Sequence, residues 1–401
     1  MRLVRLSLAI ALSVVAPRSH AQQNPPAVLG PSRGAFIARL GSDTLYVERY
    51  VRDATHLEGD VAFFNPATRV AHYRLDFTPD GRVTGFTLVT REPEAAPEQP
   101  PPFERISTVR DSVITTEIRS RGVANTSVNS RGVLHGPAVP FVSVSHAVFE
   151  QVVLRALASG RDSGRIEMFS AAPQPVFAVT VKRLRGDSVL IDIGVPLHAR
   201  VARDGRLLAL DATATTVKTL AERVDEVDLE GIVKRRLALE KSAGQPGLPS
   251  PRDTVRATVA GAALSIDYGR PSRRGRRIFG GLVPLDSVWR TGANAATQLE
   301  SSRDLVLRDA RGAETVVPAG KYTLWSIPGG AHGPTLIVNK QVGQWGTQYD
   351  PAQDLVRVPL RLTTSSSVVE RFTIDVAAEG AGGVLRLAWD DREYALPFRV
   401  R

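Results

Sequence analysis

The chain has 401 residues and a formal net charge of +10, with 43% hydrophobic and 23% charged residues. This composition excludes a disordered or fibrous protein, and the length exceeds the roughly 250 to 300 residues at which a single core stops growing. Because the sequence contains no cysteine, thiol catalysis and thiolate metal sites are excluded. We therefore expect a globular protein of two domains that is stabilised by packing without disulfides.

The first residues are typical of an export signal. Arg2 and Arg5 precede an apolar run that ends at Ala16, and small residues stand near Ala21, where a signal peptidase would cut. This pattern predicts a signal peptide over residues 1–21 and a periplasmic or secreted protein. The apolar run is too short for a transmembrane helix, and no other stretch reaches the required ~20 apolar residues. Export also argues against nucleic acid as the partner of the basic charge.

The amino-terminal half is predicted to be rich in β-strands. After a flexible lead-in at residues 22–33, segments with alternating polar and apolar residues follow one another, and Pro79-Asp80-Gly81 is typical of a hairpin turn. Helical spacing occurs at residues 146–160 and again at 228–242. Residues 34–243 are therefore expected to form an antiparallel β domain, a curved sheet or half-barrel, with one or two helices.

The second half is expected to form a separate domain. Glycine, proline and serine cluster at residues 244–252, which predicts a linker. From residue 253 to residue 401, strand-like segments are separated by turn signals about every ten residues, which favours an antiparallel β-sandwich or jelly roll.

Sequence motifs for common cofactors are missing. The histidines are scattered singly without metal-ligand spacing, and the sequence contains neither a Walker loop nor a dinucleotide-binding glycine motif. We therefore expect no metal and no cofactor.

A series of ordered motifs resembles a known bacterial family. They begin with Tyr-Gly-Arg-Pro-Ser at 268–272 and Trp-Arg-Thr-Gly-Ala-Asn at 289–294, and they continue with Pro-Ala-Gly-Lys-Tyr-Thr-Leu at 318–324 and Gln-Trp-Gly at 344–346. Together they resemble the DUF2911 family over residues 250–400. The resemblance implies an exported bacterial protein without an established activity. The family commonly has an acidic residue after the asparagine, whereas this chain has Ala295, so that carboxylate cannot act as a base here.

The same motifs supply the candidate ligand site. Arginine offers a planar, bidentate cation, asparagine both donates and accepts hydrogen bonds, and tryptophan offers an aromatic wall, which suits an anionic or carbohydrate-like ligand. The alternative is that these residues only shape crossing loops. The candidate residues are Arg270, Arg277, Trp289, Arg290, Thr291, Asn294, Trp345 and Tyr349. The neighbouring Arg273, Arg274 and Arg276 are interpreted as a solvated turn.

Three functions remain open at this point. The first is a non-enzymatic periplasmic binding or scaffold protein for an anionic or glycan-like small molecule or an envelope polymer. The second is an envelope-polymer hydrolase, in which acidic residues brought together by the fold would act beside Arg290 and Trp345. The third is an acyl-chain or lipoprotein carrier, which would need an apolar cavity of at least about 300 Å³ in the amino-terminal domain. The oligomeric state is not predicted.

Overall fold

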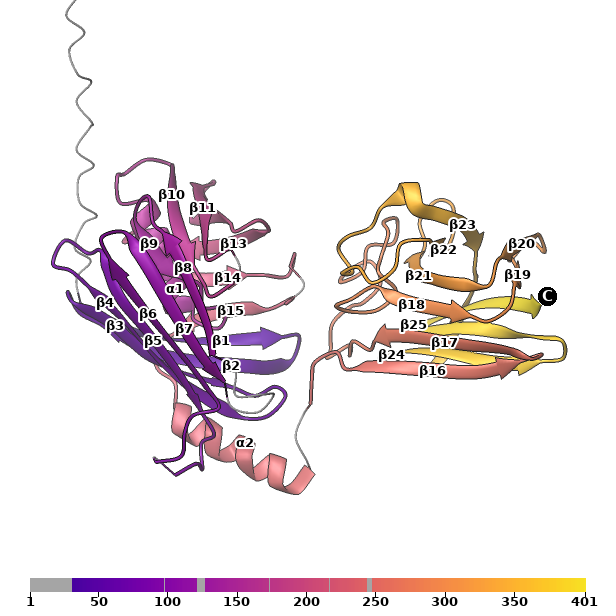
Figure 1. Cartoon of the computed structure of the whole chain (residues 1–401), viewed down its shortest axis with the longest axis horizontal. Coiled ribbons are helices and arrows are strands. Elements are labelled where there is room, and N and C mark those ends of the chain that lie inside the picture. Colours follow the sequence, from indigo (N-terminus) through magenta and orange to yellow (C-terminus); the bar gives the residue numbers. More distant parts are fainter. Residues whose placement is uncertain (1–30, 97, 121–126, 173, 216, 244–246) are drawn as a thin grey trace, which may run out of the picture.

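The computed structural model of the chain describes residues 31–96, 98–120, 127–172, 174–215, 217–243 and 247–401. These residues form two β-rich domains that lie side by side (Figure 1). The mainly β architecture confirms the predicted fold class. The expected signal peptide and most of the lead-in lie outside the described residues, and within them no helix is both long and apolar enough to cross a bilayer.

The amino-terminal domain is built on one continuous sheet. Its strand order is β8-β7-β6-β5-β4-β3-β2-β1-β15-β14-β13-β12-β11-β10-β9, so β1 and β15 join two meanders. Neighbours are antiparallel apart from β9 and β10. The strands are β1 (Ser32–Leu40), β2 (Asp43–Arg52), β3 (His56–Phe63), β4 (Arg69–Phe77), β5 (Val83–Arg91), β6 (Phe103–Arg110), β7 (Val113–Ser120), β8 (Ser127–Val133), β9 (Ala138–Pro140), β10 (Ser163–Phe169), β11 (Val176–Arg183), β12 (Ser188–Asp192), β13 (Pro196–Val201), β14 (Leu207–Asp211) and β15 (Leu220–Val224).

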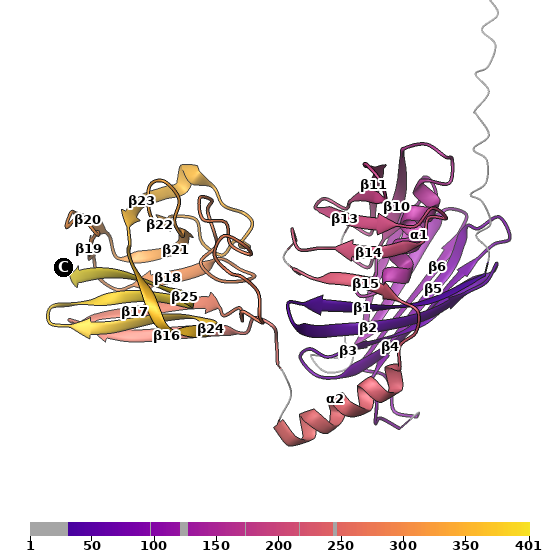
Figure 2. The same cartoon turned by 180° about the vertical axis from the view of Figure 1, so that it is seen from behind.

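Helix α1 (His146–Ala156) lies inside the curve of this sheet (Figure 2). Ser145 caps its first turn, since the hydroxyl accepts a hydrogen bond from Val148 N at 3.2 Å. Every residue of the helix except Leu154 is buried, and the helix packs against β9, β10, β11 and β14. The interior that an acyl chain would need in a carrier is therefore occupied by α1.

Helix α2 (Leu229–Ala243) covers the opposite face of the sheet. Leu229 and Val233 pack there against Val47 of β2 and Ala62 of β3. The alternation of side chains along a strand explains the two faces, because neighbouring Tyr46 belongs to the main core beneath α1. Beyond its carboxyl end the chain enters the second domain.

The carboxy-terminal domain consists of two packed sheets, one ordered β16-β17-β18-β21-β22-β23 and the other β20-β19-β25-β24. Leucine, valine and aromatic side chains from both sheets form one core between them. The long connection at residues 270–296, between β17 and β18, carries the Trp-Arg-Thr-Gly-Ala-Asn motif and most of the Tyr-Gly-Arg-Pro-Ser motif. The elements are β16 (Arg252–Val259), β17 (Ala262–Gly269), β18 (Thr297–Ser301), β19 (Leu305–Arg308), β20 (Glu314–Val317), β21 (Gly320–Ile327), β22 (Thr335–Asn339), the 3-10 turn η1 (Pro351–Gln353), β23 (Asp354–Pro359), β24 (Arg361–Glu379) and β25 (Gly382–Val400).

Candidate functional site

The segment 289–296, which contains the Trp-Arg-Thr-Gly-Ala-Asn motif, is fixed to the adjoining strand β21. Trp289 N donates to Ser326 O at 2.7 Å, and Ser326 N returns a bond to Trp289 O at 2.9 Å. The hydroxyls of Thr291 and Ser326 lie 2.9 Å apart, and the Thr297 hydroxyl donates to Thr291 O at 2.7 Å. The motif is therefore rigid before any ligand binds.

A second loop, the Gln-Trp-Gly motif at 344–346, supports the same segment from another side. Gly346 N donates to Asn294 O at 2.9 Å, and Ala296 N donates to Gln344 O at 3.2 Å. A Cβ at Gly346 would lie 2.5 Å from Asn294 O and closer still to Arg290 Cδ. Only glycine therefore lets this loop pass beside the Arg290 side chain.

The backbone of the motif is unusual at two positions. Thr291 has φ 50° and Asn294 has φ 64°, although neither is glycine. A β-branched residue in this left-handed region is uncommon, and such conformations are found disproportionately at ligand sites. The hydrogen bonds described above stabilise the two residues in this conformation.

Trp289, Arg290 and Asn294 line a cavity of about 410 Å³. This volume lies within the range of about 300 to 1,000 Å³ that is usual for small-molecule pockets. The amino-terminal domain contributes Leu40, Leu45, Val217 and Lys218 to the lining, and the linker contributes residues 248–250. The cavity therefore lies where the two domains meet.

The titratable groups in the described lining all carry positive charge. Lys218, Arg276 and Arg290 line the cavity, and no aspartate or glutamate is among the lining residues. Burial lowers the pKa of all three cations, and the Arg290 and Arg276 charges lower the pKa of Lys218 further. The site is thus a partly buried, electropositive cavity.

The two arginines of the cavity differ in their partners. Arg276 donates to Arg273 O at 3.0 Å and to Ser272 O at 2.6 Å, so part of its hydrogen-bonding capacity is used. Arg290 makes no hydrogen bond or ion pair with its side chain among the described residues, and its Nε is buried. Arg290 therefore retains its donors for a molecule in the cavity.

Trp289 forms one wall of the cavity and is itself packed. Its ring stacks on Trp389 at 5.7 Å between centroids and meets Phe372 edge-on at 5.1 Å. Trp389 also lines the cavity. The aromatic wall is consequently continuous with the core of the carboxy-terminal domain and cannot turn away from a ligand without disturbing that core.

Five of the eight candidate residues lie outside this cavity. Arg270 donates to Asp253, the carbonyl of Phe372 and the hydroxyl of Thr373, so its donors are used internally. Arg277 is exposed. Thr291, although buried beside the cavity, bonds only within its own domain.

The two aromatic candidates from residues 345 and 349 also point elsewhere. Trp345 is 44% exposed and is not among the lining residues. Tyr349 packs against Trp325 at 4.9 Å and donates to Asp354 at 2.7 Å. These two residues stabilise the end of the domain and do not complete the aromatic wall.

The interpretation of residues 273–276 as a solvated turn is wrong. Arg273 pairs with the largely buried Asp390, and Arg274 pairs with Asp43 of the amino-terminal domain. Arg276 turns into the cavity. The reason is the amino-terminal domain, whose β1–β2 turn packs on Arg274 and partly shields it from solvent: the Ser42 N–H donates to Arg274 O at 3.0 Å.

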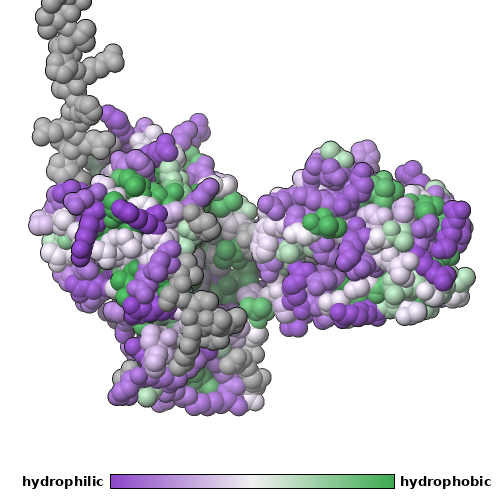
Figure 3. Space-filling model, viewed as in Figure 1, coloured by the Kyte–Doolittle hydropathy of each residue, from purple (hydrophilic) through white to green (hydrophobic). Residues whose placement is uncertain are grey.

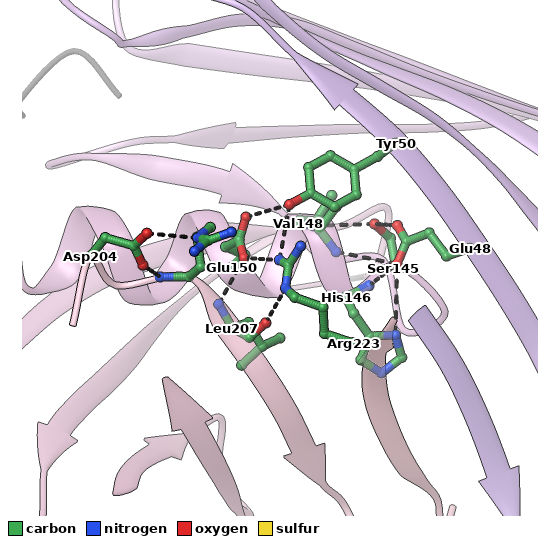
Figure 4. A network of polar contacts seen from close by, with 11 residues as sticks. Glu48, Tyr50, Ser145, His146, Val148, Glu150, Asp204, Leu207 and Arg223 are labelled. Carbon is green, nitrogen blue, oxygen red and sulfur yellow. Dashed lines mark hydrogen bonds and ion pairs between the residues drawn. The ribbon is translucent and has the colours of Figure 1, made fainter. Parts of the chain in front are cut away.

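A separate group of polar residues is buried under α1 (Figure 4). Glu48 accepts hydrogen bonds from the hydroxyls of Tyr73 and Ser145 and from the backbone N–H groups of His146 and Ala147. The carboxylate thus meets the positive end of the α1 dipole. All of these donors are supplied by the protein itself, which is typical of a structural site.

Glu150, one turn along α1, has its own partners. It accepts from Tyr50 Oη at 2.7 Å and from Leu207 N at 2.7 Å, and it pairs with Arg223. Burial raises the pKa of Glu150, while attraction to Arg223 limits the rise. Both carboxylates belong to the amino-terminal domain, and neither is among the described residues that line the interdomain cavity.

Residues 250–398 match the family model described as "Protein of unknown function (DUF2911)", which confirms the resemblance seen in the motifs. A solved structure, the "Crystal Structure of Beta-barrel-like Protein of Domain of Unknown Function DUF1849 from Brucella abortus", is 14% identical and covers 49% of this chain and 97% of that chain. Its TM-score of 0.31 is too low to support an argument. No curated protein matches the chain.

Proposed function

We propose that this chain, whose carboxy-terminal domain matches the DUF2911 family, is an exported bacterial binding protein that takes an anionic ligand beside Arg290 and catalyses no reaction. The observation that carries the proposal is the Arg290 guanidinium, which has no partner among the described residues, in a cavity whose described charged groups are all cationic. Export is supported by the signal-like pattern of residues 1–21.

The physical chemistry favours an anion over a neutral glycan. A hydrogen bond to a charged group contributes about 1.5 to 3 kcal/mol, and a guanidinium matches the two oxygens of a carboxylate or phosphate. A buried cation without a partner is costly, and a bound anion removes that cost. A sugar hydroxyl would leave all three positive charges uncompensated.

The hydrolase alternative has weaker support. Glycoside hydrolysis requires two carboxyl groups about 5 to 9.5 Å apart that flank the substrate. The described lining of the cavity offers none, and Ala295 stands where the family commonly has an acid.

The direct test replaces Arg290 with methionine, which keeps an unbranched side chain similar to the stem of arginine but removes the guanidinium group and its charge. We expect the wild-type protein to gain thermal stability from decanoate, phosphate or citrate and to gain none from maltose or N-acetylglucosamine. Arg290→Met should lower the affinity for the best of these anions at least tenfold, measured by isothermal titration calorimetry at fixed ionic strength, since about 1.4 kcal/mol corresponds to each factor of ten.

Two controls separate a binding role from a scaffold role. Arg277→Met changes an exposed arginine of the same connection and should bind like the wild type. Without ligand, Arg290→Met should melt at the same or a higher temperature, because it removes a partly buried charge that has no partner among the described residues. A variant that loses much stability, or a wild-type protein that no anion stabilises, would contradict the proposal.

A further inference from the structure

We infer that the ligand of the interdomain cavity is an amphiphilic anion, a carboxylate or phosphate with an apolar body, and that it fixes the two domains relative to each other when it binds. This inference rests on the proposed function. It adds two things: the chemical class of the ligand and a role for the amino-terminal domain at the site.

The amino-terminal domain contributes its own cation to the cavity. Lys218 stands in the loop between β14 and β15 and has φ 60°, a third non-glycine residue of left-handed conformation at this site beside Thr291 and Asn294. No salt bridge or hydrogen bond of the Lys218 ammonium occurs among the described residues, although Arg276 and Arg290 are close enough to repel it. An anion bound between Lys218 and Arg290 would be attracted by both cations and would offset the repulsion between them.

The lining also contains apolar side chains that solvent reaches. Val217, next to Lys218, is 54% exposed, and Leu248 of the linker is 56% exposed. In the face drawn in Figure 3, hydrophobic side chains gather in the recess between the domains. Exposed valine and leucine beside three cations indicate a ligand that carries an apolar body as well as a charge.

The rest of the wall is equally apolar. Leu40 and Leu45 of the amino-terminal domain face the cavity together with Leu282 and Val288 of the carboxy-terminal domain. A small inorganic anion would satisfy the cations but leave this surface in contact with water. Burial of the surface by a hydrocarbon chain contributes about 25 cal/mol per Å².

A bound ligand would add to the direct contacts between the two domains. The polar contacts centre on Arg274, whose carbonyl accepts from Ser42 N at 3.0 Å and whose guanidinium pairs with Asp43. Domains joined by a small polar interface move relative to each other by default. A ligand that touches Lys218 on one side and Arg290 on the other stabilises one arrangement.

The experiment uses the full chain and three probes: decanoate, acetate as the charged head alone, and decanol as the apolar body alone. Because the chain has no cysteine, Arg185→Cys and Ala381→Cys place one fluorophore specifically on an exposed position of each domain. Calorimetry then gives the affinities, and single-molecule energy transfer gives the spread of interdomain distances.

We expect decanoate to bind at least about tenfold more tightly than acetate or decanol and to narrow the distance distribution. Lys218→Met should weaken decanoate binding about tenfold and prevent the narrowing. Lys182→Met, an exposed lysine of the same domain, should behave like the wild type.

The outcomes distinguish this inference from the proposed function. If acetate binds through Arg290 as tightly as decanoate, the amphiphilic class is overturned while anion binding stands. If decanoate binds but the distances stay broad, or Lys218→Met has no effect, the role of the amino-terminal domain is overturned. If no anion binds, or decanol binds as tightly as decanoate, the proposed function falls as well.

Discussion

Arg290, which is partly buried, differs in its partners from the buried Arg105. Arg105, for example, donates to the carbonyls of Phe141 and Phe169 at 2.9 and 3.0 Å and lies 5.0 Å above the Phe86 ring. Burial lowers the pKa of Arg105 to about 10, and both of its terminal nitrogens have partners although its Nε has none. The Arg105 guanidinium is thus buried against carbonyls, whereas the partly buried Arg290 has no such partner among the described residues, which is why we assign it to a ligand.

Glu48 provides a test of the amino-terminal core at the residue scale. Glu48→Ala removes the acceptor for four donors around the start of α1, so we expect the free energy of unfolding of that domain to fall by at least about 3 kcal/mol. Urea unfolding followed by far-ultraviolet circular dichroism measures the loss.

The chain supplies an internal reference for this measurement. All four tryptophans lie between residues 289 and 389, in the carboxy-terminal domain, so the tryptophan fluorescence midpoint should stay unchanged in Glu48→Ala. Glu222→Ala, which removes an exposed partner of Arg39, should shift neither signal appreciably. Equal shifts in both signals would show that the domains do not unfold as separate units.

At the scale of elements, the two loops at residues 289–296 and 344–346 form one unit. In Gly346→Ala, the added Cβ would clash with the Asn294 backbone and the Arg290 side chain and displace both. We expect the free energy of unfolding, measured by tryptophan fluorescence, to fall by about 1 to 3 kcal/mol. Anion affinity should fall together with stability.

Gly329→Ala is the matched control for that change. A Cβ there would meet Leu285 and Arg392 at ordinary distances of 3.6 to 3.7 Å, so stability and binding should stay near the wild-type values. An anion affinity that survives Gly346→Ala intact would mean that this loop does not position Arg290.

Sequence patterns predict the elements well because alternation and helical spacing are local. In β4, for instance, Ala71, Tyr73 and Leu75 point to the core in alternation, and the Pro-Asp-Gly turn follows as expected. The family motifs likewise indicate Trp289, Arg290 and Asn294. The patterns do not indicate which arginines of the connection stay free, because that depends on partners such as Asp253 and Thr373, which are distant in the sequence.

At the scale of the whole molecule, half of the cavity was not predictable from the sequence. Val217 and Lys218 belong to no motif, and they reach the site only because the pairing of β1 with β15 directs the β1–β2 turn and the β14–β15 loop to the second domain. The sequence predicts a solvated Arg276 for the same reason, because it does not show that the amino-terminal domain packs beside this residue. In the sequence, Gly41 and Gly275 indicate two tight turns, and both have positive φ in the structure. The two turns meet near Arg274, but the sequence does not show that they do.

The most direct test of the central claim is the position of a bound amphiphilic anion. The full chain is crystallised with 10-bromodecanoate near the concentration that half-saturates it in solution, and the bromine is located by its anomalous scattering. We predict one bromine site in the interdomain cavity, with the carboxylate about 2.7 to 3.2 Å from the Arg290 guanidinium. A saturated protein whose bromine lies elsewhere, for example beneath α1, would contradict the account.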